Sequence, residues 1–80
     1  MNENLEKLRQ AFADSLQVDL AEITDSLNQE SVEKWDSLAM ISLITEIEAI
    51  FGVSFLVSEL VELNSFSAAV EALKRKGVSF

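Results

Sequence analysis

The chain has 80 residues, enough for one compact domain, since domains typically run from about 50 to about 250 residues. It contains no cysteine and no histidine, which excludes disulfides, thiolate metal sites and the imidazole base of a Ser-His-Asp triad. Six basic and 14 acidic residues give a net charge of −8, opposite to the basic field that binds nucleic acids. We therefore expect one domain over residues 1–80, with no catalytic residues, no metal site and no nucleic-acid partner.

The first segment, Glu3 to Leu16, is predicted to form an amphipathic helix. Its large apolar residues recur three and four positions apart and so share one helical face: Leu5, Leu8, Phe12 and Leu16. Charged and amide side chains occupy the opposite face, which we expect to contact solvent.

The helical period is lost between Gln17 and Asp36. Apolar side chains are scattered there among polar ones: Val18, Leu20, Ile23, Leu27, Val32 and Trp35. A connection of about 20 residues without regular structure is usually functional or locally folded. We predict a long loop that these side chains pin to the core, with one short helical turn around residues 21–24.

Three further helices are predicted after the loop. Asp36 is a suitable N-cap for a helix over 37–51, and Gly52 is a suitable stop. A shorter helix is expected over 56–63, and Asn64 or Ser65 then caps a last helix that ends near the basic run 74–76. The expected fold is all-α: a four-helix bundle of three longer helices and one short helix, with a long loop between helices 1 and 2.

The helix after Asp36 carries two apolar surfaces. The broad one is expected to face the core, and its members are Met40, Leu43, Ile44, Ile47, Ile50 and Phe51. The small one lies beside Ser37 and consists of Leu38, Ile41 and Thr45. Scattered surface apolarity or contact with the long loop would explain the small surface. A partner-docking patch rimmed by acidic residues would also explain it.

Ser37 has a structural and a functional interpretation. A serine directly after an N-cap aspartate usually does no more than begin a helix. Self-contained nucleophilic catalysis needs an activating base, and the chain has no histidine to supply one. A hydroxyl modified by a separate enzyme needs only exposure and a fixed backbone, and a phosphate there would meet the free N–H groups of the helix start.

The residues around Ser37 resemble the Asp-Ser-Leu helix of acyl carrier proteins. The motif Trp35-Asp36-Ser37-Leu38 is followed by further matching positions: Met40, Ile41, Leu43, Ile47, Glu48, Phe51, Gly52 and Val53. The first helix, the acidic loop and the last helix also fit, so the resemblance covers nearly the whole chain.

This resemblance implies a cofactor and a set of partners. In that family the motif serine, here Ser37, carries 4′-phosphopantetheine that a phosphopantetheinyl transferase donates from coenzyme A. Asp36 and Leu38 match the flanks of the motif, and cargo is held as a thioester on the thiol of the arm. Partner enzymes with basic surfaces, an acyl- or aminoacyl-loading ligase and a downstream synthase or transferase, would meet residues Leu38, Ile41, Thr45, Glu46 and Glu48. Candidate linings for an acyl chain are Met40, Ile44, Ile47 and Phe66.

Some positions depart from the pattern of fatty-acid carriers. Ala39 and Ser42 stand where many such carriers have acids, and Lys34 stands where a glycine is common. The resemblance therefore implies a specialised stand-alone carrier, not an enzyme, for fatty-acyl, hydroxyacyl, polyketide or aminoacyl cargo of a lipid, polyketide or cell-envelope pathway. We expect a cytoplasmic monomer that does not insert into membranes. The alternatives are an aminoacyl or peptidyl carrier and an unmodified acidic adaptor.

Overall fold

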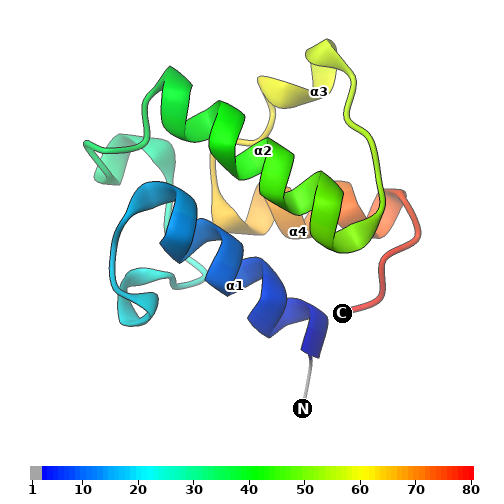
Figure 1. Cartoon of the computed structure of the whole chain (residues 1–80), viewed down its shortest axis with the longest axis horizontal. Helices are drawn as coiled ribbons and strands as arrows, with labels where there is room; N and C mark the ends of the chain where they lie inside the picture. The colour runs from blue at the N-terminus through cyan, green and yellow to red at the C-terminus, as the bar shows by residue number, and fades with distance from the viewer. Residues whose placement is uncertain (1–2) are drawn as a thin grey trace.

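The computed structural model describes residues 3–80 of the chain. Its α-helices, in chain order, are α1 (Glu3–Leu16), α2 (Ser37–Phe51), α3 (Val57–Leu60) and α4 (Phe66–Arg75). Two 3-10 turns, η1 (Leu20–Glu22) and η2 (Gln29–Ser31), lie in the connection between α1 and α2. No strand occurs in the described part, and the predicted all-α bundle of three longer helices and one short helix is confirmed (Figure 1).

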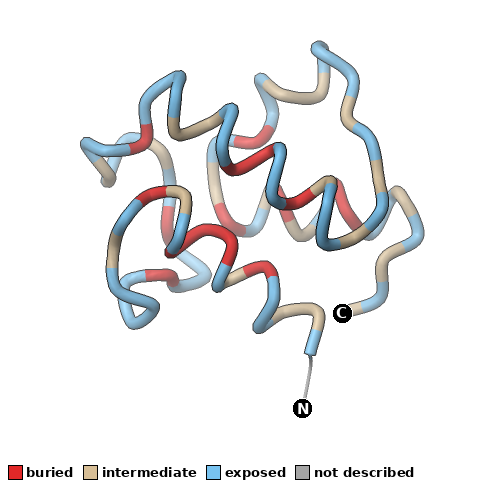
Figure 2. Tube along the Cα trace, in the orientation of Figure 1, coloured by how far each residue is buried: buried red, intermediate tan, exposed pale blue. Residues whose placement is uncertain are grey.

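The three longer helices enclose the core. In Figure 1, α1 and α2 run beside each other and α4 lies behind them. The buried positions of α1 and α2 face the interior, whereas most of the connecting loop is exposed (Figure 2). The start of α1 also contacts the C-terminal segment, because the Asn4 side-chain amide donates a hydrogen bond to the Ser79 carbonyl at 2.9 Å.

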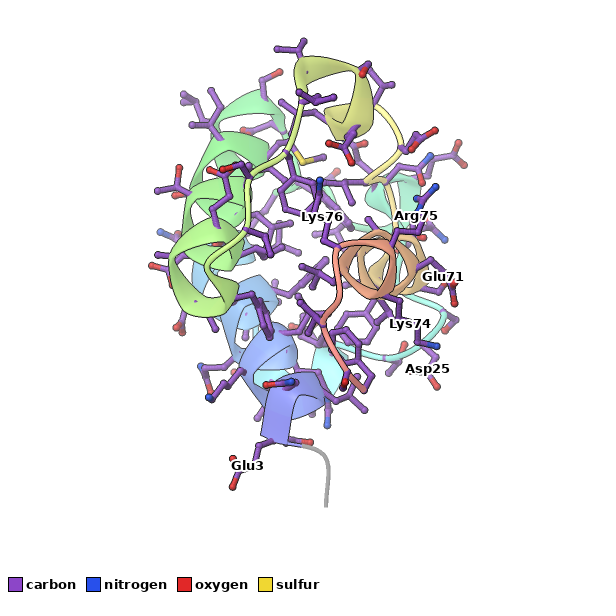
Figure 3. The ribbon with its side chains drawn as sticks, turned by 90° about the vertical axis from the view of Figure 1, so that its right-hand side faces the viewer. Glu3, Asp25, Glu71, Lys74, Arg75 and Lys76 are labelled. Carbon is purple, nitrogen blue, oxygen red and sulfur yellow. The ribbon has the colours of Figure 1, made fainter. Side chains whose placement is uncertain are left out.

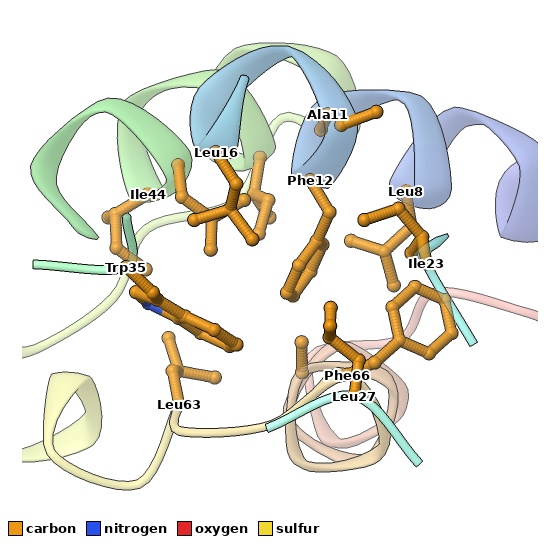
Figure 4. Packing of buried hydrophobic residues seen from close by; sticks show 14 of the residues in the cluster. Leu8, Ala11, Phe12, Leu16, Ile23, Leu27, Trp35, Ile44, Leu63 and Phe66 are labelled. Atoms are coloured by element: carbon orange, nitrogen blue, oxygen red, sulfur yellow. The ribbon is translucent and has the colours of Figure 1, made fainter. Parts of the chain in front are cut away.

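Three aromatic side chains from distant parts of the chain form the centre of the core. The Phe12 ring meets Trp35 edge-on, with 5.5 Å between ring centroids, and meets Phe66 at 5.2 Å. Figure 4 shows Phe12 projecting from α1 between these two partners. Edge-to-face pairs add about 0.5–1.5 kcal/mol each beyond the burial of their area. The contacts thus join α1, the long loop and α4.

The long loop is pinned to the core, as predicted. Ile23, Leu27 and Trp35 are buried, and Val18 and Val32 are half-buried against the same cluster. One predicted anchor is not buried: Leu20, the first residue of η1, is 37% exposed. That turn covers Leu20–Glu22, one to two residues earlier than expected.

The second turn, η2, was not predicted and is built from polar contacts. The Asn28 side chain accepts a hydrogen bond from the Ser31 N–H at 3.0 Å, which caps the turn. The loop is also tied to the start of α4. Gln29 N–H donates to the Asn64 carbonyl at 2.8 Å, and Phe66 N–H donates to the Leu27 carbonyl at 3.0 Å.

The helix ends follow the predicted signals. Gly52 has φ +65°, a left-handed conformation that glycine adopts without steric cost, and its N–H donates to the Glu48 carbonyl at 2.9 Å. Of the two candidate caps for α4, Ser65 is the one used. Its hydroxyl accepts from the Ala68 N–H at 3.0 Å.

Two expectations about the later helices are wrong. The third helix covers only Val57–Leu60, because the chain continues past it in a turn with bonds such as Leu63 N–H to the Leu60 carbonyl. Ile50, expected in the core, is 38% exposed because it lies at the margin of the apolar stripe. The core-facing side of α2 is formed by three buried residues, Leu43, Ile44 and Ile47.

Candidate functional site

Ser37 is exposed and is the first residue of α2. The preceding Asp36 caps the helix, as predicted, since one of its carboxylate oxygens accepts from the Ala39 N–H at 2.9 Å. The Asp36 carbonyl also accepts from the Met40 N–H at 2.9 Å. These bonds fix the backbone on both sides of Ser37, so its hydroxyl is presented to solvent from a rigid frame.

The small apolar surface of α2 lies outside the core. Leu38 is 78% exposed and Ile41 is 64% exposed, and Thr45 is exposed as well. The Thr45 hydroxyl donates to the Ile41 carbonyl at 2.8 Å, so this hydroxyl is engaged within the helix. The structure thus brings these three predicted contact residues together on one exposed face beside Ser37.

The two acidic residues predicted to contact partners differ in their surroundings. Glu46 is exposed. Glu48 is half-buried, and one of its carboxylate oxygens accepts from the Phe55 N–H at 2.8 Å. Glu48 therefore holds the segment between α2 and α3, and half of its carboxylate is already engaged.

Sequence reasoning missed a second group of exposed apolar residues around α3. Leu56 is 69% exposed, Val57 is 83% exposed and Val61 is 79% exposed. In both Figure 1 and Figure 3, α3 lies at the same end of the molecule as the start of α2. A signal was present in the sequence, because five of the eight residues 56–63 are apolar and so short a helix can turn only some of them toward the core.

Polar contacts tie α3 to the end of α4. The Glu59 carboxylate accepts from the Leu56 N–H at 2.8 Å and from the Lys76 ammonium at 3.0 Å. These contacts, the backbone one foremost, lower the pKa of Glu59 below its ordinary value. The Lys76 ammonium also lies 5.0 Å from the centre of the Phe55 ring. Figure 3 shows the basic residues gathered around this end of α4.

The residues suggested as linings for an acyl chain lie in or against the packed core. Ile44, Ile47 and Phe66 are buried, and Met40 is half-buried against the same cluster. Well-packed cores have little empty space. These four side chains therefore fill the interior in this structure.

An open groove of about 440 Å³ runs between the end of α1 and the start of α2. Its lining includes Asp36 and Leu38, the two chain neighbours of Ser37, and Ser15 from α1. Ser15 Oγ is buried and has no hydrogen-bond partner within the described residues.

None of the helices within residues 3–80 combines the length and the apolarity that a membrane span requires. Comparison with curated proteins gave no match. The family model described as "Phosphopantetheine attachment site" matches residues 6–73, a range that includes the start of α2 and Ser37. Domains of this family carry covalently bound 4′-phosphopantetheine and are not catalytic themselves, which favours a carrier over an unmodified adaptor. The chain therefore belongs to the phosphopantetheine attachment-site family and is a carrier protein with 4′-phosphopantetheine as its covalent cofactor.

Proposed function

We propose that the chain is an acyl carrier protein and that Ser37 is the residue to which 4′-phosphopantetheine is attached. The observation that carries this proposal is that Ser37, the first residue of α2, is exposed, while the Asp36 cap holds the backbone beside it. The Asp-Ser-Leu sequence at this point and its place within the matched range support the same assignment.

The residues around Ser37 fit a phosphate-bearing polar arm. The first turn of α2 has N–H groups that are not used within the helix, and these favour a nearby anion. When bound, the cofactor supplies a thiol for thioester chemistry, which the chain cannot supply because it has no cysteine.

In the attachment step, the Ser37 oxygen forms a bond to the phosphorus that bears the pantetheine group of coenzyme A. The pyrophosphate P–O bond breaks, and the nucleotide leaves with its electron pair. The serine proton passes to a base that the transferase supplies. The chain's own part is to present the hydroxyl in a fixed position and to dock the transferase.

Docking is assigned to the exposed face beside Ser37. Leu38 and Ile41 give it an apolar centre, and Glu46 is an exposed acid on the same helix. The net charge of −8 favours partners with a basic surface. We therefore propose that the transferase, the loading ligase and the downstream synthase or transferase approach this face in turn.

An apolar acyl cargo suits the interior of the bundle. Met40 is half-buried beside Ile44, and methionine side chains adapt easily to new shapes. An apolar chain that entered there would replace contacts with water by contacts with the core. An aminoacyl or peptidyl cargo is the second candidate, favoured by Ala39 and Ser42 at positions where many fatty-acid carriers have acids.

Loading by a transferase tests the attachment site. The wild-type chain, incubated with coenzyme A and a broad-specificity phosphopantetheinyl transferase, should gain the mass of one phosphopantetheinyl group by intact mass spectrometry. Ser37→Ala should show no gain, whereas Ser42→Ala, an exposed serine of the same helix, should load like the wild type. Loading of Ser37→Ala, or no loading of the wild type beside a control carrier that loads, would refute the assignment.

A further inference from the structure

The segment between α2 and α4 is attached to the bundle with little burial in the core. None of residues 53–62, all of which the structure describes and which include α3, is buried. Val53, Phe55 and Leu60 are half-buried against the core cluster, and the next buried residue along the chain is Leu63. Segments with few buried apolar contacts open locally at a lower cost than the core of a protein. The position of α3 therefore depends on its polar contacts.

Lys76 lies at the centre of these contacts. Its ammonium donates to Glu59 Oε1 at 3.0 Å, and the same oxygen accepts from the Leu56 N–H at 2.8 Å. The ammonium also lies 5.0 Å from the centre of the Phe55 ring, within the range of a cation–π contact. In Figure 3 the Lys76 side chain extends from the end of α4 toward α3. One lysine thus contacts the segment at two places, one before α3 and one within it.

The lysine side of this contact is the firmly anchored one. Lys76 directly follows the last residue of α4, and its backbone N–H donates to the carbonyl of the buried Leu73 at 3.0 Å. The other side belongs to the segment without buried residues, whose front is tied to α2 by the bond from the Phe55 N–H to the Glu48 carboxylate. Loss of the Lys76 contacts should therefore free α3 and leave α4 in place.

The Lys76–Glu59 pair is better shielded from solvent than the ion pair beside it. Its side chains are 21% and 27% exposed, and its charged atoms are 3.0 Å apart. In the Arg75–Glu62 pair the side chains are 66% and 61% exposed and the charged atoms are 3.8 Å apart. Exposed pairs contribute little, whereas partly buried pairs are screened much less. Lys76 is therefore the main electrostatic contact between α4 and α3.

We propose that residues 53–62 form a lid and that Lys76 is the clasp that keeps this lid closed on the bundle. Opening breaks both contacts of the clasp and leaves α1, α2 and α4 folded. It uncovers the half-buried Phe55 and Leu60 and releases α3 from its place at the end of the molecule that presents Ser37. The lid does not depend on what is attached to Ser37, so it is a property of the chain beyond the proposed carrier function.

Water-exchange NMR on the isotope-labelled full chain, without the arm, tests the clasp. The N–H groups of Glu59 and Glu62 report on the lid, because both donate to carbonyls within the segment. Lys76→Met should accelerate their exchange at least about fivefold, as expected when an ion pair and a cation–π contact are lost together. The N–H groups of Gly52 and Ala69, which belong to α2 and α4, should exchange as in the wild type.

Two variants at the end of α4 serve as matched controls. Lys74→Met removes an equal charge from an exposed ion pair with Glu71, so exchange in the lid should stay within about twofold of the wild type. Lys76→Arg keeps the charge of the clasp and should also stay within about twofold. Loss of a positive charge by itself lowers the local concentration of hydroxide, the catalyst of exchange. Faster exchange in Lys76→Met therefore reports opening and not the changed field.

Two results would overturn the proposal. Unchanged exchange of the lid amides in Lys76→Met would mean that the packing of Leu60 holds α3. Equal acceleration at Gly52 and Ala69 would mean that the whole bundle opens, without a separate lid.

Glu59→Gln takes the place of Lys76→Met if that variant does not fold. The glutamine oxygen can still accept from the Leu56 N–H, so the change removes the charge of the clasp and keeps the local turn. The Glu62 N–H should then exchange at least about twofold faster than in the wild type. An unchanged rate there would contradict the clasp.

Discussion

Two leucines of α2 differ in burial, and the proposed docking face depends on this difference. Leu43 is 1% exposed, whereas Leu38 is 78% exposed. Leucine-to-alanine changes at buried sites cost about 2–5 kcal/mol. An 80-residue domain has a total stability of about 4–12 kcal/mol at about 0.05–0.15 kcal/mol per residue. Leu43→Ala should therefore lower Tm by at least about 8 °C, since each 1 kcal/mol is worth about 4–8 °C in so small a domain.

Leu38→Ala should change the free energy of unfolding by no more than about 0.5 kcal/mol, because exposed side chains contribute little to stability. It should nevertheless slow loading by the transferase about tenfold, the equivalent of about 1.4 kcal/mol lost at a central interface contact. Thermal unfolding by circular dichroism and the initial rate of mass gain measure the two effects. If Leu38→Ala lowers the free energy of unfolding by more than about 2 kcal/mol, the Leu38 side chain belongs to the core. If the variant is loaded as fast as the wild type, Leu38 is not part of the docking face.

The pH dependence of stability should change in Glu59→Gln. The pKa of Glu59 is lowered from 4.5 by the Leu56 N–H and by Lys76, so its stabilising effect is complete above pH 4.5 and is lost as the pH falls through the lowered pKa. Between pH 4.5 and more acidic values, Tm should fall less steeply in Glu59→Gln than in the wild type or the control Glu46→Gln, and parallel curves would contradict this. Gly52→Ala should cost about 1 kcal/mol, or about 4–8 °C in Tm, because a side chain at φ +65° is strained even though open space surrounds it. An unchanged Tm would argue against the left-handed end of α2.

Local signals in the sequence determined the two helices that matter most for the site. The apolar period fixed α1 as Glu3–Leu16, and Asp36 and Gly52 marked the ends of α2. Periodicity and caps depend on interactions within a few residues of each other, so they can be read without knowledge of the fold. The same period placed Leu38 and Ile41 outside the core stripe, but whether the long loop covers them was left to the tertiary structure.

Only the tertiary structure decided which groups meet across the chain. The sequence predicted Glu48 as a partner contact, and only the fold shows that its carboxylate also accepts a hydrogen bond from the Phe55 N–H, a contact that depends on the path of the chain after α2. The short helix α3 ends at Leu60, earlier than predicted, and Val57 on it is exposed, because burial on α3 depends on how the rest of the bundle packs. The groove beside Ser37 likewise requires the end of α1 to lie against the start of α2. Contacts between residues far apart in sequence have no periodic signature, and that is why the buried hydroxyl of Ser15 emerged from the fold alone.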